Sequence, residues 1–195
     1  MSDTDDPPRI LVVCRANVAR SPLAAAMLRD ALAHTGIEVG SAGVQASAGA
    51  PAARGSVELA ARRGLDLTGH VSTPVSVELL LGASLVLTMS ERHRDLCTLR
   101  AAGLGPRTFT LREFDRLTAA AAVTSPRPIE AAHMAGWLDR LVQAAHGARP
   151  AAPPPSGPED IADPIGRDWD HWFALDEELS ELIARVAARL APPRG

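Results

Sequence analysis

Aromatic residues are scarce in this chain of 195 residues, where they make up 3% of the sequence and tyrosine does not occur at all. A folded core must therefore be built from aliphatic side chains, and 46% hydrophobic residues suffice for one domain. Cysteine is also rare. Cys14 and Cys97 are too few for a disulfide framework or a metal-ligand set, which favours a reducing, cytoplasmic setting.

Strong positive charge and long apolar runs are missing as well. The net charge of −3 argues against a nucleic-acid partner, since such proteins usually carry a basic balance. The longest apolar run, Leu79–Leu87, is too short to span a bilayer, so we expect no membrane span. The start, "MSDTDDPPR", has neither the basic nor the apolar region of a signal peptide. We expect residues 1–8 to form a disordered acidic tail.

Short apolar segments alternate with segments of helical periodicity over the first half of the chain. This alternation predicts an α/β domain with a parallel sheet. The predicted strands are Arg9–Val13, Glu38–Ala42, Leu85–Thr88 and Arg107–Leu111, and the predicted helices are Ser21–His34, Ala52–Arg63 and Glu91–Ala102.

The second half differs in composition. Ile129–Ala145 has apolar residues on one helical face, and the proline-rich segment Gly147–Pro158 reads as a stiff linker or exposed loop. Trp172–Leu190 has the spacing of a long amphipathic helix.

The stretch "ILVVCRANVARSP" places Cys14 where a predicted strand ends and a predicted helix follows. Backbone N–H groups in such a turn and at the helix start are free to bind one anion. These groups and Arg20 would favour the thiolate of Cys14, and Arg20 can hold two phosphate oxygens at once. Ser21 can donate to the thiolate, and Asn17 tolerates left-handed backbone geometry and can brace the turn. The alternative is that Cys14 is a small buried apolar residue.

A cysteine that attacks a phosphate ester needs a partner to protonate the leaving oxygen. Asp163 precedes Pro164 in a predicted loop, where proline fixes the local backbone and could hold the carboxyl group over a crevice. The alternative is that this Asp-Pro pair only begins the final helix. The neighbouring acids Asp160, Asp168 and Asp170 are competing candidates.

In these motifs the chain resembles the low-molecular-weight protein-tyrosine phosphatases. "VCRANVARSP" is similar to the phosphate loop of that family, and "ADPIG" is similar to its acid loop. "SAG" at Ser41–Gly43, "LDLTGH" at Leu65–His70 and "LVLTMSE" at Leu85–Glu91 follow the family's order. The resemblance implies a three-layer, doubly wound, four-stranded parallel sheet with helices on both faces. It also implies a single domain over residues 9–191, with an insertion at about 119–158 made of a helix and a proline-rich loop.

The resemblance implies a phosphatase that forms a phosphocysteine, with Cys14 as nucleophile, Arg20 as phosphate clamp and Asp163 as general acid and base. It implies protein phosphotyrosine or a small aryl phosphate as substrate, inorganic phosphate as product, and a tyrosine kinase as a possible partner. No metal or organic cofactor is expected. Asn17, Ser21 and Ser41 would support the loop, and His70 is expected at the surface or beside a helix. The expected phosphate-binding residues are Arg15, Ala16, Asn17, Val18, Ala19, Arg20 and Ser21.

Two departures from the family pattern keep other functions open. Ala16 replaces the loop glycine, which would be strained if that position required a positive φ. Ile165 replaces the tyrosine that walls the family's cleft, so an aromatic face is lost. One alternative is a non-catalytic module that binds phosphate or phosphoproteins. Another is an arsenate reductase that uses an external thiol, because two cysteines cannot form a three-cysteine relay.

Overall fold

Four short parallel strands form the centre of the molecule in the computed structural model, which describes residues 7–121 and 133–191. They are β1 (Arg9–Cys14), β2 (Glu38–Gly43), β3 (Leu85–Thr88) and β4 (Thr108–Thr110), in the spatial order β2-β1-β3-β4. The chain passes from β1 to β2 on one side and then to β3 on the other side of β1. This reversal opens a crevice at the carboxyl ends of β1 and β3, where open α/β sheets bind their ligands.

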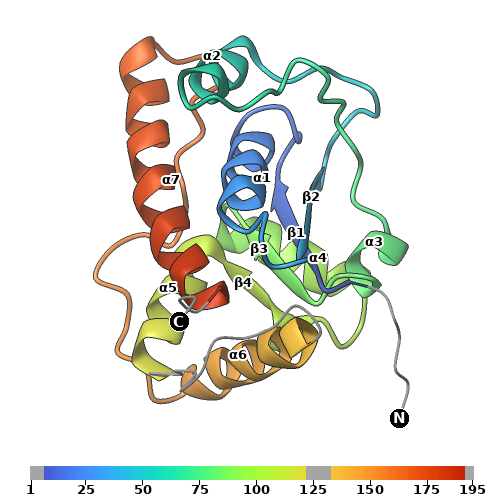
Figure 1. The fold of residues 1–195 in the computed structure, drawn as a ribbon, viewed down its shortest axis with the longest axis vertical. Helices are drawn as coiled ribbons and strands as arrows, with labels where there is room; N and C mark the ends of the chain where they lie inside the picture. Colours follow the sequence, from blue (N-terminus) through green and yellow to red (C-terminus); the bar gives the residue numbers. More distant parts are fainter. Residues whose placement is uncertain (1–6, 122–132, 192–195) are drawn as a thin grey trace.

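Helices cover both faces of this sheet (Figure 1). Along β1, Ile10, Val12 and Cys14 face the core formed with α1, α2, α5, α6 and α7. Leu11 and Val13 face a smaller core formed with α3 and α4. The predicted three-layer, doubly wound architecture is thus confirmed. The helices are α1 (Arg20–Ala31), α2 (Arg54–Arg62), α3 (Val77–Leu81), α4 (Glu91–Arg100), α5 (Leu111–Ala121), α6 (Met134–Ala148) and α7 (Trp169–Leu190).

The predicted strands all occur, but the fourth is shorter than expected. A 3-10 turn at Gly105–Arg107 precedes β4, and α5 begins directly after it at Leu111. Helix α5 is absent from the sequence prediction. Its apolar residues Leu111, Phe114 and Leu117 are buried, and the first of them directly follows the strand, so no polar residue separates the pattern of the strand from that of the helix.

The predicted helix at Ile129–Ala145 corresponds to α6, although residues 129–132 lie outside the described part of the chain. The predicted acidic tail also falls mostly outside it, since residues 1–6 are not described. The division into one domain over 9–191 with an insertion at about 119–158 stays a prediction. Within that segment, α6 contacts α5 and the 3-10 turn.

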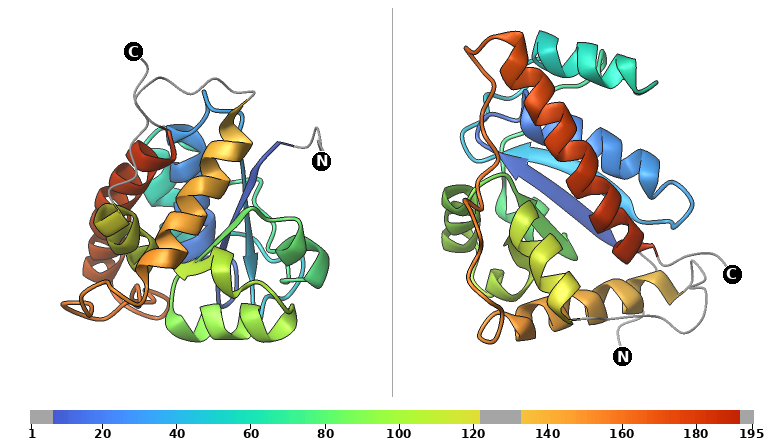
Figure 2. Two further views of the ribbon diagram at one scale, coloured as in Figure 1. Left: turned by 90° about the horizontal axis from the view of Figure 1, so that it is seen from below. Right: turned by 90° about the vertical axis from the view of Figure 1, so that its left-hand side faces the viewer.

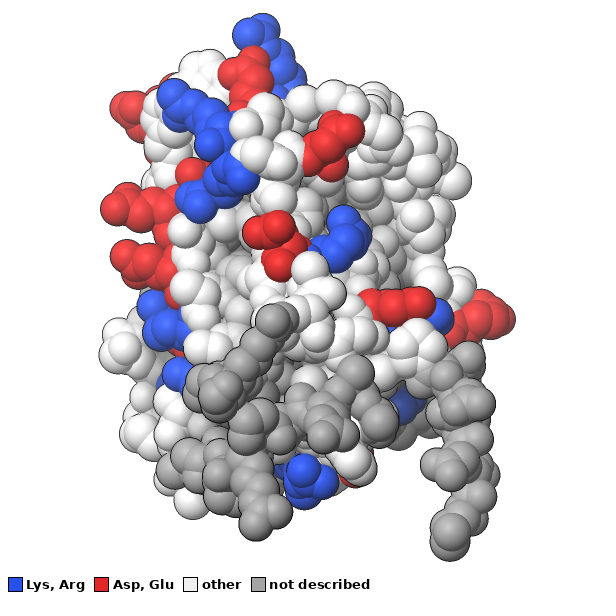
Figure 3. Space-filling view, in the orientation of Figure 1, with Lys and Arg blue, Asp and Glu red and all other residues white. Residues whose placement is uncertain are grey.

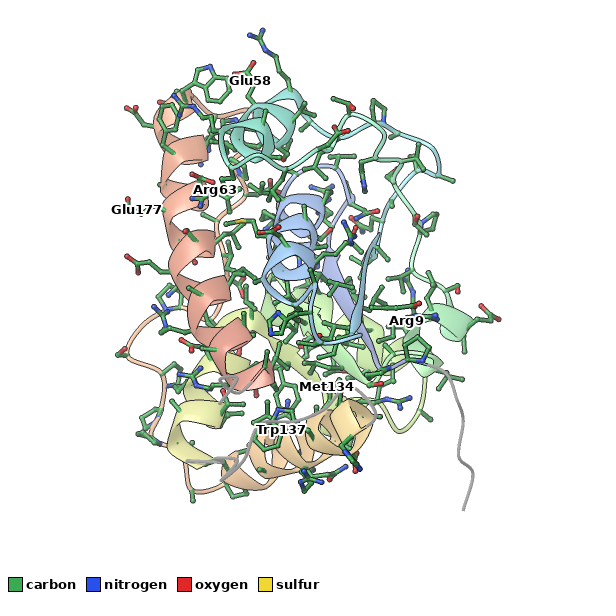
Figure 4. The ribbon with its side chains drawn as sticks, viewed as in Figure 1. Arg9, Glu58, Arg63, Met134, Trp137 and Glu177 are labelled. Atoms are coloured by element: carbon green, nitrogen blue, oxygen red, sulfur yellow. The ribbon has the colours of Figure 1, made fainter. Side chains whose placement is uncertain are left out.

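Helix α7 is tied to its neighbours by polar contacts as well as by its apolar face. Arg63, just after α2, donates from Nε and Nη2 to the Asp176 carboxylate at 2.7 and 2.9 Å (Figure 4). Trp137 of α6 donates from Nε1 to the Leu190 carbonyl at 3.1 Å. On the face drawn in Figure 3, acidic and basic side chains alternate near α7 and α2, with no large patch of one sign. No helix among the described residues is long and apolar enough to cross a membrane.

Candidate active site at the end of strand β1

Cys14 is the last residue of β1, and its side chain is enclosed by the turn that leads into α1. Its exposed fraction is 2%. The Asn17 N–H donates to Cys14 Sγ at 3.3 Å, and the Ser21 hydroxyl donates to the same sulfur at 3.0 Å. The sulfur thus accepts two hydrogen bonds, one from the turn that follows β1 and one from the start of α1.

Asn17 braces the turn, as the sequence predicts. It is the one non-glycine residue with positive φ among the described residues, at 55°. Its Nδ2 donates to Ser21 Oγ at 3.0 Å and to Ser41 Oγ at 2.9 Å. Its Oδ1 accepts from the Thr73 N–H at 2.8 Å, and His70 Nε2 lies 2.8 Å from its carbonyl oxygen. His70 therefore contacts the loop itself, whereas a surface or helix-flanking position was expected.

Gly43, at the end of β2, leaves the space that the turn occupies. A Cβ atom at this position would lie 2.8 Å from both the Arg15 carbonyl oxygen and the Asn17 nitrogen. Both are backbone atoms, so no side chain could move aside. The motif "SAG" contains this glycine, but the motif alone does not indicate why a glycine is needed. The reason is the close approach of the turn to β2.

The turn offers donors that the described part of the protein does not use. The N–H groups of Ala16, Val18 and Ala19 donate to no described residue. Arg20 Nε is buried and has no partner in residues 7–121 and 133–191. A buried donor without an acceptor is costly, and an anion would satisfy these donors together. Ala16 does not have a positive φ, so the strain considered for this substitution does not arise.

Asp163 lies against Arg20, 143 positions away in sequence, with 2.5 Å between Oδ2 and Arg20 Nη2. Arg20 Nη1 donates to the Ile161 carbonyl at 2.9 Å, and the Ile161 N–H donates to the Met89 carbonyl at 2.9 Å. These bonds fix the segment that carries Asp163 across the strand ends. In the right view of Figure 2 this segment, in orange, passes the tips of the strands. The Asp163 side chain remains 39% exposed, so the carboxyl group reaches solvent.

The three competing acids have other positions. Asp160 accepts a hydrogen bond from the Glu91 N–H at 2.8 Å. Asp168 is the N-cap of α7, where it accepts from the His171 N–H at 3.3 Å. Asp170 lies in the first turn of α7. Only Asp163 among these four contacts the turn after β1, and so the structure brings together Cys14, Arg20 and Asp163.

Glu159 anchors the same segment to the neighbouring strand, a contact that the sequence analysis missed. Its buried carboxylate accepts from Thr110 Oγ1 at 2.8 Å and from Arg116 Nη2 at 2.9 Å. Thr110 ends β4, so the bond holds the segment at the carboxyl edge of the sheet. A buried carboxylate is stable when it is paired in this way.

His93, in the first turn of α4, is a second residue that the sequence analysis did not use. Its side chain is buried, and Nδ1 has no partner in the described residues. Burial, together with the nearby positive charges of Arg20 and Arg92, lowers the pKa of His93 from 6.5 to about 4, although the carboxylates of Asp160 and Asp163 oppose this shift. The imidazole beside the site is therefore neutral near pH 7. The described residues hold no group of three or more His, Cys, Asp or Glu placed to bind a metal.

Comparisons with known proteins point to one family. The family model described as low molecular weight phosphotyrosine protein phosphatase matches residues 9–147. The protein-arginine-phosphatase of Geobacillus stearothermophilus is 30% identical over 94% of this chain and 97% of its own length. The probable low molecular weight protein-tyrosine-phosphatase EpsP of Ralstonia solanacearum is 36% identical over 55% of this chain and 72% of its own. The solved YwlE arginine phosphatase from G. stearothermophilus has a TM-score of 0.68 at 30% identity, covering 94% of this chain and 93% of its own.

Proposed function

Because the chain belongs to the low molecular weight phosphotyrosine protein phosphatase family, we propose that it hydrolyses phosphorylated protein side chains through a phosphocysteine at Cys14. The observation that carries this proposal is the environment of the Cys14 sulfur. It accepts hydrogen bonds from the Asn17 N–H and the Ser21 hydroxyl, in a turn that Arg20 and Asp163 close. This arrangement combines a nucleophile, donors for an anion and an acid.

In the first step the Cys14 thiolate attacks phosphorus, and a sulfur–phosphorus bond forms while the bond from phosphorus to the leaving oxygen breaks. Asp163 gives its proton to that oxygen. In the second step water attacks the phosphocysteine, Asp163 takes a proton from the water, and the sulfur–phosphorus bond breaks to release phosphate. The Ser21 hydroxyl stabilises the thiolate that leaves.

The phosphoryl group is held by the turn in this mechanism. Arg20 Nε has no described partner. Nη2, beside it on the same planar fork, has a second hydrogen besides the one that it donates to Asp163, so the two nitrogens can bind two oxygens at once. The free N–H groups of Ala16, Val18 and Ala19 add donors that are fixed before the substrate arrives. Because Asp163 contacts Arg20, a phosphoryl group bound at Arg20 lies next to the acid.

We propose phosphotyrosine as the substrate side chain. The half-buried loop residues Ala16 and Val18 are apolar, and Ile165, two residues after the acid, is 50% exposed. Such surfaces favour contact with an aryl ring. Phosphoarginine is the second candidate, because the relatives named protein-arginine-phosphatase match this chain from end to end.

An arsenate reductase with an internal relay is not supported. Cys97 lies in the apolar cluster on the opposite face of the sheet from Cys14. The proposed setting is the cytoplasm, with both cysteines as free thiols, and a tyrosine kinase is the proposed source of the substrate.

The test is hydrolysis of p-nitrophenyl phosphate by the wild type, Cys14→Ser and Cys97→Ser. We expect turnover by the wild type and Cys97→Ser and none by Cys14→Ser. Binding of phosphate without turnover by the wild type would support a non-catalytic module, and full activity of Cys14→Ser would exclude the mechanism. One carrier protein phosphorylated on tyrosine or on arginine then distinguishes the two substrates by kcat/KM.

A further inference from the structure

A small pocket lies directly beside the proposed catalytic turn, between that turn and the start of α4. Its volume is about 220 Å³. It opens between the turn after β1, the residues after β2 and the first turns of α4. The residues that line it are Arg15, Val44, Gln45, Arg92, His93 and Leu96.

One wall of the pocket is continuous with the turn that would bind phosphate. Arg15 follows Cys14 in the chain, and its carbonyl accepts from the Gln45 N–H at 2.8 Å. The Arg15 Nε in turn donates to Gln45 Oε1 at 3.0 Å. This second bond holds the guanidinium at the pocket wall, and its two terminal nitrogens have no hydrogen-bond partner in the described part of the chain. A group bound by Arg15 would therefore be held by the residue that directly follows Cys14.

The other wall is α4, where Arg92 is exposed. The acidic neighbours Glu91 and Asp95 lie within ion-pair distance of Arg94. Within residues 7–121 and 133–191, neither Arg92 nor Arg15 forms an ion pair with a carboxylate. The pocket thus carries two arginines that no acid in the described chain neutralises.

The remaining lining residues suit a short acidic side chain. No carboxylate lines the pocket, and Val44 and Leu96 supply apolar surface. His93, which is 6% exposed, adds to the lining an imidazole ring that is uncharged near pH 7. Two guanidinium groups above an apolar floor match a carboxylate on a short methylene stem.

We propose that this pocket binds the carboxylate of an acidic residue next to the phosphorylated residue of the substrate. The pocket then selects among phosphoproteins, while the turn at Cys14 binds the phosphoryl group common to all of them. This inference rests on the proposed function and specifies its substrate class.

The experiment compares phosphotyrosine peptides that differ only in one neighbouring residue, Glu or Gln. One pair varies the residue before the phosphotyrosine and a second pair varies the residue after it. For the wild type at low salt we expect kcat/KM to be about five- to tenfold higher for Glu in one pair, mainly through KM. The preference should weaken as salt is added.

Arg92→Gln should abolish this preference and leave the hydrolysis of p-nitrophenyl phosphate unchanged, and Arg92→Glu should reverse it. Arg140→Gln removes the same charge from an exposed position on α6, and it should keep the preference. Equal kcat/KM for Glu and Gln in both pairs, or a preference for Glu that survives Arg92→Gln, would overturn the proposed role of the pocket. Neither result would affect the proposed phosphatase function. A wild type inactive on p-nitrophenyl phosphate would overturn the proposed function and this inference with it.

Discussion

The two cysteines of this chain are almost equally buried, with exposed fractions of 2% for Cys14 and 0% for Cys97, yet their surroundings are opposite. Cys97 is packed among apolar side chains of α4 and the sheet, and burial raises its pKa to about 11. Cys14 lies on the other face, at the end of β1, and accepts hydrogen bonds from Asn17 and Ser21. Burial among apolar side chains keeps the Cys97 thiol protonated, whereas the Cys14 sulfur is surrounded by hydrogen-bond donors.

The contrast follows from position along the fold. A cysteine on the inner side of α4 meets only side chains, because the helix uses its own N–H groups. A cysteine at the carboxyl end of a parallel strand meets a turn whose N–H groups have no partner in the ladder. The same residue type is therefore packed among apolar side chains in one region and lies among hydrogen-bond donors in the other, where we propose that it acts as the nucleophile.

The largest expected effect is selective alkylation. With a pKa of about 11, only about one Cys97 side chain in 10,000 is a thiolate at neutral pH. Iodoacetamide should modify Cys14 first, inorganic phosphate should protect it, and Cys97 should react only after unfolding. Peptide mapping by mass spectrometry measures both sites in one sample. If Cys97 in the folded protein were labelled as fast as Cys14, the predicted difference in reactivity between the two cysteines would be wrong.

Asp163→Asn is expected to reduce kcat by about a thousandfold on substrates with poor leaving groups, because the departing oxygen loses its acid. The loss should shrink as the leaving group becomes more acidic. Asp168→Asn, which removes a carboxylate at the start of α7, is the matched control and should leave kcat unchanged. An equal loss over a series of aryl phosphates would contradict the acid role.

Gly43→Ala tests whether the turn must approach β2 closely. The added Cβ would meet backbone atoms of the turn at 2.8 Å. We expect kcat/KM to fall about a hundredfold, the cost of an ångström-scale displacement at a reacting centre. Gly40→Ala in the same strand places its Cβ at an ordinary 3.8 Å from Leu11 and should keep activity. Equal activity of both variants would refute this account of Gly43.

The smallest expected effect concerns His93, four residues before Cys97 on α4. Its folded pKa of about 4 lies below the ordinary value of 6.5, so the unfolded chain binds a proton that the folded protein excludes. The stabilising contribution is present above pH 6.5 and is lost as pH falls towards 4, with a slope of at most about 1.4 kcal/mol per pH unit. Urea unfolding of wild type and His93→Gln over this range measures the slope. A slope unchanged in His93→Gln would assign it to other groups.

The sequence predicted the local parts of the site well. The strand, turn and helix around Cys14 follow one another within a few residues, and each has its own signature of apolar run, Asn17 and Pro22. Asn17, Ser21 and Ser41 were expected to support the loop, and the structure adds that Asn17 donates to both serine hydroxyls. Where one segment supplied all the parts, pattern and chemistry were enough.

Contacts between distant segments were harder to predict. Nothing in the residues around Glu159 indicates that it meets Thr110, and His70 gave no sign that it would reach the Asn17 carbonyl. Such contacts form where loops meet at the carboxyl edge of the sheet. The hydrophobic periodicity of the sequence does not show which loops meet there. The Asp-Pro pair and the family resemblance already indicated Asp163 among its neighbours, but its contact with Arg20, 143 positions away, is visible only in the structure.

The most direct test of the difference between the two cysteines is to trap the intermediate. Asp163→Asn should slow the hydrolysis of phosphocysteine, since it lacks the base that activates water. Mixed with p-nitrophenyl phosphate and quenched rapidly in acid, this variant should carry one phosphoryl group on the peptide that contains Cys14. The peptide that contains Cys97 should carry none. Turnover with no phosphoryl group on Cys14 at any time, or with the group on Cys97, would contradict the account.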